Sequence, residues 1–92
     1  MLPVHLTLRR DDDAAAPTDA DAETLHDALW AHATPDTGLE HVRARAVRQG
    51  ISVVLYLRAR TAPEARQQAL RVLDAALAAA PGSHGHSVTL HG

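Results

Sequence analysis

Four segments of the chain alternate apolar and polar residues with the period of two that is typical of half-buried strands. The first is residues 4–8, where Val4, Leu6 and Leu8 are the apolar positions. Residues 41–47 (HVRARAV) follow the same pattern, and residues 51–57 (ISVVLYL) give the strongest one. In the last segment, residues 86–91 (HSVTLH), Val88 and Leu90 are the expected inward pair. Each strand therefore has one side suited to a core and one suited to water.

Two helices are expected between these strands, with a loop at residues 11–17 before the first and a turn at residues 34–38 after it. Thr18 or Asp19 can cap the first helix, which runs to about Ala33. Residues 61–64 (TAPE) form a capping box for the second, and Pro81-Gly82 ends it. The expected core residues are Ala22, Leu25 and Leu29 of the first helix and Leu70, Leu73, Leu77, Ala69, Val72, Ala76 and Ala80 of the second.

Gln49-Gly50 suits a tight hairpin turn, because a two-residue loop with glycine second is a common hairpin connection. This loop makes the numbers of paired residues add up to 99, so that Ala46 lies opposite Val53 and Val42 opposite Leu57. On the other side of the hairpin the same register places Arg43 opposite Tyr56. The two apolar sets then coincide on one side.

The element order is strand, helix, strand, strand, helix, strand, which predicts a ferredoxin-like βαββαβ sandwich of the α+β class. Its four-stranded antiparallel sheet has the order 4-1-3-2, and right-handed crossovers place both helices on one face. At 92 residues, the chain is long enough for this single domain, residues 1–92, and for no second core.

Composition and charge narrow the function classes. No apolar stretch is long enough to span a membrane, no signal peptide is expected, and the expected compartment is the cytoplasm. The net charge of −2 argues against a nucleic-acid binder, which is usually strongly basic. An RNA-binding sheet would also need several aromatic rings on its central strands, where this chain offers only Tyr56.

The face of the sheet without helices is expected to be rich in arginine and free of carboxylates, whereas seven of the eleven acidic residues lie within residues 11–27. Such a face predicts a non-enzymatic protein-interaction module that binds a partner protein or a second copy. The alternative is that exposed arginines only keep the sheet soluble. The proposed contact residues are Arg43, Arg45, Val54, Tyr56 and Arg58, with Arg43 stacked over Tyr56 in a cation–π contact.

Trp30 on the first helix, four residues after His26, is a further candidate contact residue because tryptophan is enriched at binding hot spots. The alternative is a ring half-buried at the boundary between helix and sheet.

The histidines supply the alternative function, a small-ligand or metal-binding regulatory module. His84, His86 and His91 lie close in sequence, and His5 could join them from the neighbouring strand. If the last strand begins at His86, however, His86 and His91 point to opposite sides and cannot share an ion. The sequence contains no cysteine, no nucleophile elbow and no phosphate-binding glycine loop, so neither an enzyme nor a cofactor is expected.

Residues 38–46 (GLEHVRARA) and 50–59 (GISVVLYLRA), together with the alanine-rich helices, resemble small stand-alone ferredoxin-like proteins of actinobacteria. The resemblance extends over the whole chain. Since most of these proteins have no assigned activity, it implies an architecture and no particular function.

Overall fold

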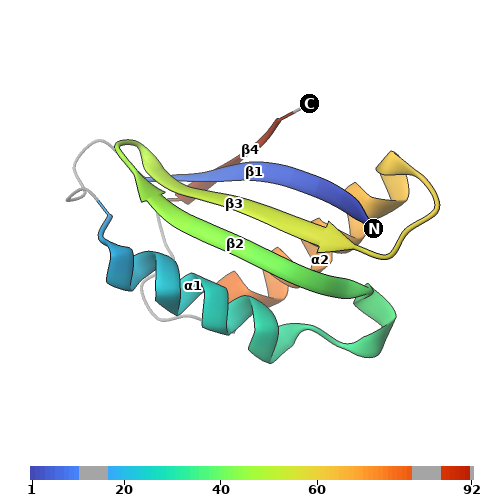
Figure 1. The fold of residues 1–92 in the computed structure, drawn as a ribbon. Helices are drawn as coiled ribbons and strands as arrows, with labels where there is room; N and C mark the ends of the chain where they lie inside the picture. The colour runs from blue at the N-terminus through green and yellow to red at the C-terminus, as the bar shows by residue number, and fades with distance from the viewer. Residues whose placement is uncertain (11–16, 80–85, 92) are drawn as a thin grey trace.

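The computed structural model describes residues 1–10, 17–79 and 86–91. The elements are β1 (Leu2–Arg10), α1 (Asp19–His32), the 3-10 helix η1 (Pro35–Thr37), β2 (Leu39–Val47), β3 (Gly50–Leu57), α2 (Ala62–Ala79) and β4 (His86–His91) (Figure 1). The strands form one sheet of order β2-β3-β1-β4, which is 4-1-3-2 counted from the other edge. Every neighbouring pair is antiparallel, so the protein is an α+β fold with an open antiparallel sheet.

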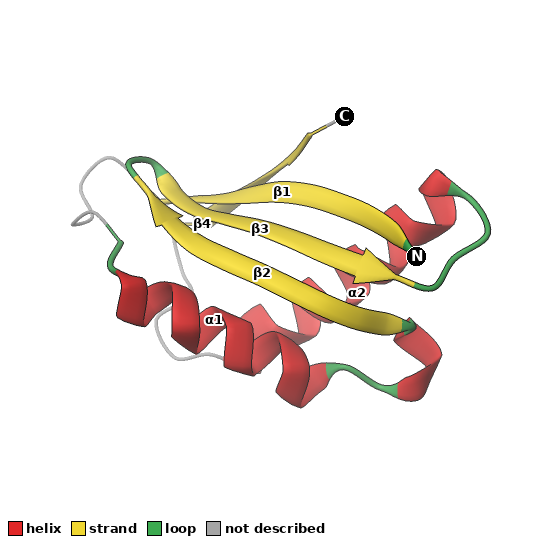
Figure 2. Ribbon diagram, in the orientation of Figure 1, coloured by secondary structure: helices red, strands yellow, loops and turns green. Residues whose placement is uncertain are grey.

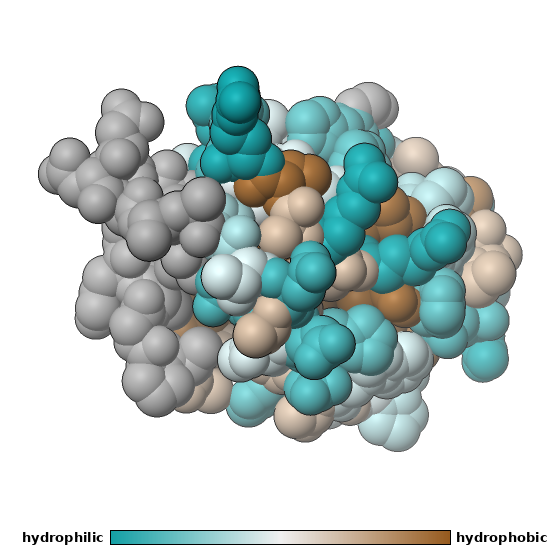
Figure 3. All heavy atoms as spheres, turned by 60° about the vertical axis from the view of Figure 1, so that its left-hand side comes forward, coloured by the Kyte–Doolittle hydropathy of each residue, from teal (hydrophilic) through white to brown (hydrophobic). Residues whose placement is uncertain are grey.

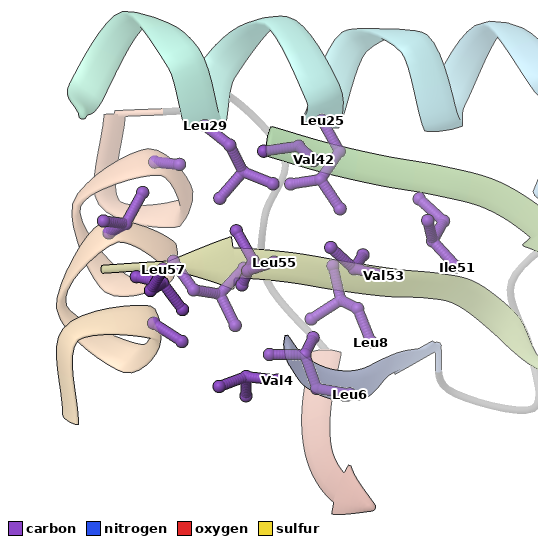
Figure 4. Close-up of a cluster of buried hydrophobic side chains, with 14 of the residues drawn as sticks. Val4, Leu6, Leu8, Leu25, Leu29, Val42, Ile51, Val53, Leu55 and Leu57 are labelled. Atoms are coloured by element: carbon purple, nitrogen blue, oxygen red, sulfur yellow. The ribbon is translucent and has the colours of Figure 1, made fainter. Parts of the chain in front are cut away.

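Both helices pack on the same face of the sheet (Figure 2). α1 lies against β2, whereas α2 lies against β1, β3 and α1. The core is the layer between sheet and helices, and Figure 4 shows its valine, leucine and isoleucine side chains converging from both layers. No described element covers the second face, which we call the open face.

The apolar alternation of β1 and β3 produces this arrangement directly. Val4, Leu6 and Leu8 of β1 are buried, as are the four odd-numbered residues from 51 to 57 in β3. In α1 the predicted stripe of Ala22, Leu25 and Leu29 is confirmed as buried.

The second helix differs from the prediction in which residues it buries. Ala65, Ala69, Val72, Leu73 and Ala76 are buried, whereas Leu70 and Leu77 are only half-buried. Alanines occupy most of this buried stripe. Ala80, which was predicted to belong to this stripe, lies outside the described residues.

The first turns of both helices are capped by threonine. The Thr18 hydroxyl accepts a hydrogen bond from the Asp21 backbone N–H at 3.2 Å, while Asp21 Oδ2 accepts one from the Thr18 N–H at 2.8 Å. These reciprocal bonds form a complete capping box and decide between the two predicted caps in favour of Thr18. In α2 the Glu64 N–H donates to the Thr61 hydroxyl at 3.3 Å, which is one half of the predicted box.

The predicted register of the β2–β3 hairpin is wrong by two residues. Val47 pairs with Gly50, Ala46 with Ile51 and Val42 with Leu55, so the turn is Arg48-Gln49 and Gly50 is the first residue of β3. A shift of two keeps every side chain on its predicted face, which is why the apolar pattern could not reveal it. Glycine is needed at residue 50 because a Cβ there would overlap the carbonyl oxygen of Leu8 in β1.

A bulge interrupts β2 near its start. Leu39 pairs with Leu57, but the next pair joins His41 to Tyr56, so Glu40 is the extra residue. The Arg58 Nε donates to Glu40 Oε1 at 3.3 Å at this end of the hairpin. Arg58, which was predicted to lie on the arginine-rich face, therefore follows the end of β3 and pairs with Glu40.

The last strand lies at the edge of the sheet, beside β1 (Figure 1). Val88 pairs with Leu8 and Leu90 with Leu6, which places both on the helix-bearing side as expected. They are nevertheless 37% and 41% exposed, so they face the predicted side of the sheet without being buried in the core. The reason is the placement of the helices: among the described elements, β4 makes extensive contacts with β1 alone.

Candidate functional site

The open face contains a hollow of about 470 Å³ over the three strands β1, β2 and β3. It is lined by His5, Arg43, Ala44, Arg45, Ser52, Val54 and Tyr56. The antiparallel register explains why these side chains meet: Arg43 lies opposite Val54, Arg45 opposite Ser52, and His5 opposite Val54 from the other side. The hollow thus combines two guanidinium groups, an imidazole, two hydroxyl groups and an apolar surface.

The two arginines that line the hollow have no acidic partner among the described residues. The ion pairs present there are Arg58–Glu40 and His26–Asp27, neither of which lines the hollow. Arg43 and Arg45 are both exposed, whereas Val54 and Tyr56 are half-buried. The space-filling view shows hydrophobic patches between protruding hydrophilic side chains (Figure 3). Free cations beside partly covered apolar surface suit a ligand that carries negative charge on an apolar frame.

Tyr56 has a different cross-strand neighbour from the one predicted. Because of the corrected register, His41 lies opposite Tyr56, and the two ring centroids are 5.6 Å apart at an angle of 41°. Arg43 lies opposite Val54, one pair further along the hairpin. The predicted pairing of Arg43 with Tyr56, on which the cation–π contact depended, is therefore wrong. Both side chains nevertheless line the same hollow.

Two histidines stack on the open face, and one of them, His5, also lines the hollow. The rings of His5 and His91 have their centroids 4.4 Å apart at an angle of 30°. Each Nε2 also lies within hydrogen-bonding distance of a hydroxyl: His5 at 2.9 Å from Ser52 Oγ, and His91 at 2.7 Å from Thr7 Oγ1. The structure therefore brings His5 and His91 together across β1 and β4, as the strand order requires.

The other predicted metal ligands do not join this pair in the part of the chain that the structure describes. His86 is paired with Arg10 through the strand backbone, and His84 lies outside the described residues. Within residues 1–10, 17–79 and 86–91, no group of three histidine or carboxylate side chains is placed to hold a metal ion.

Trp30 is separated from the other predicted contact residues. It lies on α1, in the helix layer, with 39% of its surface exposed, and it does not line the hollow. Of the six predicted contact residues, the structure gathers Arg43, Arg45, Val54 and Tyr56 at the hollow and leaves Trp30 and Arg58 outside it.

Sequence reasoning did not include His5 and Ser52 among the contact residues of this hollow. A signal for both was available, because the order 4-1-3-2 places the first strand beside the third. On the open face, the polar side chains of the first strand must then lie next to those of the third strand.

No protein-family model, curated protein or solved structure significantly matches this chain. The resemblance to small actinobacterial proteins therefore stays a prediction. Neither described helix combines the length and the apolar character needed to cross a bilayer.

Proposed function

We propose that the chain is a non-enzymatic interaction module that binds an acidic segment of a partner protein on its open sheet face. One observation carries the proposal: Arg43 and Arg45 lack acidic partners among the described residues and flank a hollow lined by Val54 and Tyr56. Carboxylates of a partner would form charge-assisted hydrogen bonds with the guanidinium groups. Apolar side chains next to those carboxylates would cover Val54 and Tyr56.

The charges favour a different protein over a second copy bound face to face. A symmetric contact through the open face would bring Arg43 and Arg45 of one copy toward the same residues of the other, and like charges in contact are unfavourable. The described acidic residues of α1, namely Asp19, Asp21, Glu23 and Asp27, lie in the other layer. The open face therefore suits an acidic partner better than its own copy.

The element order and the strand order support a ferredoxin-like topology, with β3 between β1 and β2 and with β1 between β3 and β4. This fold hosts many unrelated functions, so the proposal is based on the site and not on the fold. The cytoplasm remains the expected compartment.

A metal-binding regulatory module remains the alternative. The stacked pair of His5 and His91 favours it, because two imidazoles on neighbouring strands could supply two ligands to a transition metal. Both rings already have hydroxyl partners, and a third ligand would have to come from outside the described residues. Elemental analysis of protein purified without an affinity tag tests this alternative directly.

The proposed function is tested with a fluorescently labelled acidic peptide in which glutamates alternate with leucines. Its binding to the parent chain is measured by fluorescence anisotropy at several salt concentrations. The double variant Arg43→Glu/Arg45→Glu should bind at least about tenfold more weakly, because it loses two charge-assisted hydrogen bonds and gains repulsion. Binding to the parent should also weaken as salt rises.

The matched control is Arg66→Glu/Arg71→Glu on α2, which changes the net charge by the same amount in the helix layer. This control should bind the peptide nearly as well as the parent. Equal losses in both variants would mean that net charge alone attracts the peptide, and the site assignment would be wrong. Tighter binding of a single-stranded RNA of equal charge would favour a nucleic-acid partner and overturn the proposal.

A further inference from the structure

The outer edge of β4 is a second candidate binding surface, separate from the hollow on the open face. β4 pairs with β1 on one side and ends the sheet on the other, so a row of its backbone N–H and C=O groups has no strand partner among the described residues. Exposed edges of this kind are templates for adding a further strand, and proteins usually protect them with charges, bulges, proline or a covering element.

The opposite edge of the same sheet has such protection. β2 carries Arg43, Arg45 and Glu40 among its exposed residues, has a bulge at Glu40, and packs against α1. By contrast, residues 86–91 contain no Asp, Glu, Lys, Arg or Pro. β4 also pairs with β1 without any register shift, and neither described helix packs extensively against it. Among the described residues, the β4 edge therefore lacks the protection that the β2 edge has.

β4 also exposes apolar side chains next to the core. Leu90 pairs with Leu6, which is fully buried, and Val88 pairs with Leu8, which is 3% exposed. Val88 and Leu90 thus extend the apolar side of the sheet beyond the cover that the helices provide. A strand placed beside β4 would cover them if it presented apolar residues on the same side.

We propose that the strand that pairs with β4 is the β4 of a second copy of this chain. A two-fold axis perpendicular to the sheet makes the two strands antiparallel and keeps both helix layers on one side. Directly opposite residues then point to the same side of the sheet. With Thr89 on the axis, Val88 of each copy lies opposite Leu90 of the other, and Ser87 lies opposite His91.

This register makes the strand complementary to itself. All five residues from 87 to 91 find a partner, the four apolar side chains of the two copies form one cluster, and Thr89 meets Thr89 on the open side. Cross-strand pairs of aliphatic residues and of threonines are favourable. Since residues 87–90 carry no charge, pairing with an identical strand brings no like charges together. An edge contact of one short strand is small, so the expected dimer is reversible and forms at high protein concentration.

The test is sedimentation velocity of the full chain over a concentration range of about 5 to 500 µM, where a dimer of this size class should appear. We expect the parent to shift from monomer toward dimer, and Leu90→Lys to remain monomeric. A parent that stays monomeric over the whole range overturns the proposal. A dimer that Leu90→Lys leaves unchanged also overturns it.

Thr89 gives a second test that leaves the core untouched, because its side chain is exposed. Thr89→Lys and Thr89→Glu should each be monomeric, since each places like charges opposite one another on the axis. An equimolar mixture of the two variants should dimerise at least as well as the parent. A mixture that stays monomeric overturns the register centred on Thr89. Arg43→Glu/Arg45→Glu should dimerise like the parent, which separates this proposal from the proposed function.

Discussion

Substitution of Gly50 by alanine tests the packing of β3 against β1 at the end of the hairpin. Gly38 is the described glycine with a positive φ, at 67°, so the backbone at Gly50 is one that an L-residue can adopt. At such a position, replacing glycine by alanine normally stabilises a protein by about 0.4 to 1 kcal/mol, because the unfolded chain loses freedom. The expected sign at Gly50 is the opposite.

The cause of this reversal is the close approach of β1. A Cβ at residue 50 would overlap the Leu8 carbonyl oxygen and would lie 2.9 Å from the Leu8 carbonyl carbon and 3.0 Å from the Arg9 Cα. These are backbone atoms inside a sheet, so they cannot rotate away. We expect a packing cost of about 1 to 3 kcal/mol, and about 1 kcal/mol more for a weakened backbone hydrogen bond where Arg9 pairs with Gly50.

After the gain of about 0.4 to 1 kcal/mol from the unfolded chain is subtracted, the net loss in free energy of unfolding is about 1 to 3.6 kcal/mol, a substantial share of the roughly 5 to 14 kcal/mol expected for a domain of this size. It is measured by urea unfolding followed by circular dichroism. With a urea m-value of about 1 to 1.5 kcal/mol/M, the midpoint should fall by roughly 0.7 to 3.6 M. A midpoint equal to or above that of the parent would refute the close approach of the two strands.

Asparagine distinguishes this cause from the turn that the sequence suggested. If Gly50 were needed for a left-handed turn conformation, Gly50→Asn would be tolerated better than Gly50→Ala, because asparagine adopts that conformation more readily. If the clash with β1 is the reason for glycine at residue 50, Gly50→Asn should destabilise the protein at least as much as Gly50→Ala. At Gly38, whose φ is positive, asparagine should recover part of the loss that alanine causes.

Three further substitutions test the core, a helix cap and a buried amide, each by urea unfolding. Leu55→Ala should cost about 2 to 5 kcal/mol, because Leu55 is fully buried at the centre of β3. Thr18→Ala should cost about 1 kcal/mol through loss of the capping box, whereas Thr18→Ser should keep most of the stability of the parent. Gln68→Met should raise stability by about 1 kcal/mol, because the buried Gln68 Oε1 has no hydrogen-bond partner in the described part of the chain.

Alternation along the chain was sufficient to predict four strands and their sides that face the core, while capping residues and apolar stripes predicted the two helices. It could not give the hairpin register, because shifts of two residues leave the apolar sides unchanged. Gly50 distinguishes the predicted hairpin register from the observed one. Glycine is required there by a close contact with Leu8, 42 positions earlier in the chain. Such contacts between distant segments are invisible to a local pattern.

The candidate site was predicted in part for a similar reason. Arg43, Arg45, Val54 and Tyr56 share a face by periodicity alone, and the structure gathers them at one hollow. Periodicity does not show where a strand ends, which is why Arg58 was included although β3 stops at Leu57. Nor does it show how far a helix covers a sheet, which decides that Val88 and Leu90 are exposed.

The two proposed surfaces together predict that the dimer binds two acidic segments at once. A two-fold axis perpendicular to the sheet places both open faces on the same side. The strand order of the dimer would then be β2-β3-β1-β4-β4-β1-β3-β2, with five strand spacings between the two β3 strands. At about 4.8 Å per spacing, the two hollows lie roughly 24 Å apart.

A flexible glycine- and serine-rich linker of about 20 residues has a root-mean-square length close to this distance. Two copies of the acidic peptide joined by such a linker should therefore bind the parent chain at least about tenfold more tightly than one copy does. The gain depends on the β4 contact, so Leu90→Lys should abolish it while binding the single peptide as the parent does. If Leu90→Lys keeps the full gain, the two hollows are not joined through β4, because a monomeric module offers the second peptide no second hollow on the same particle.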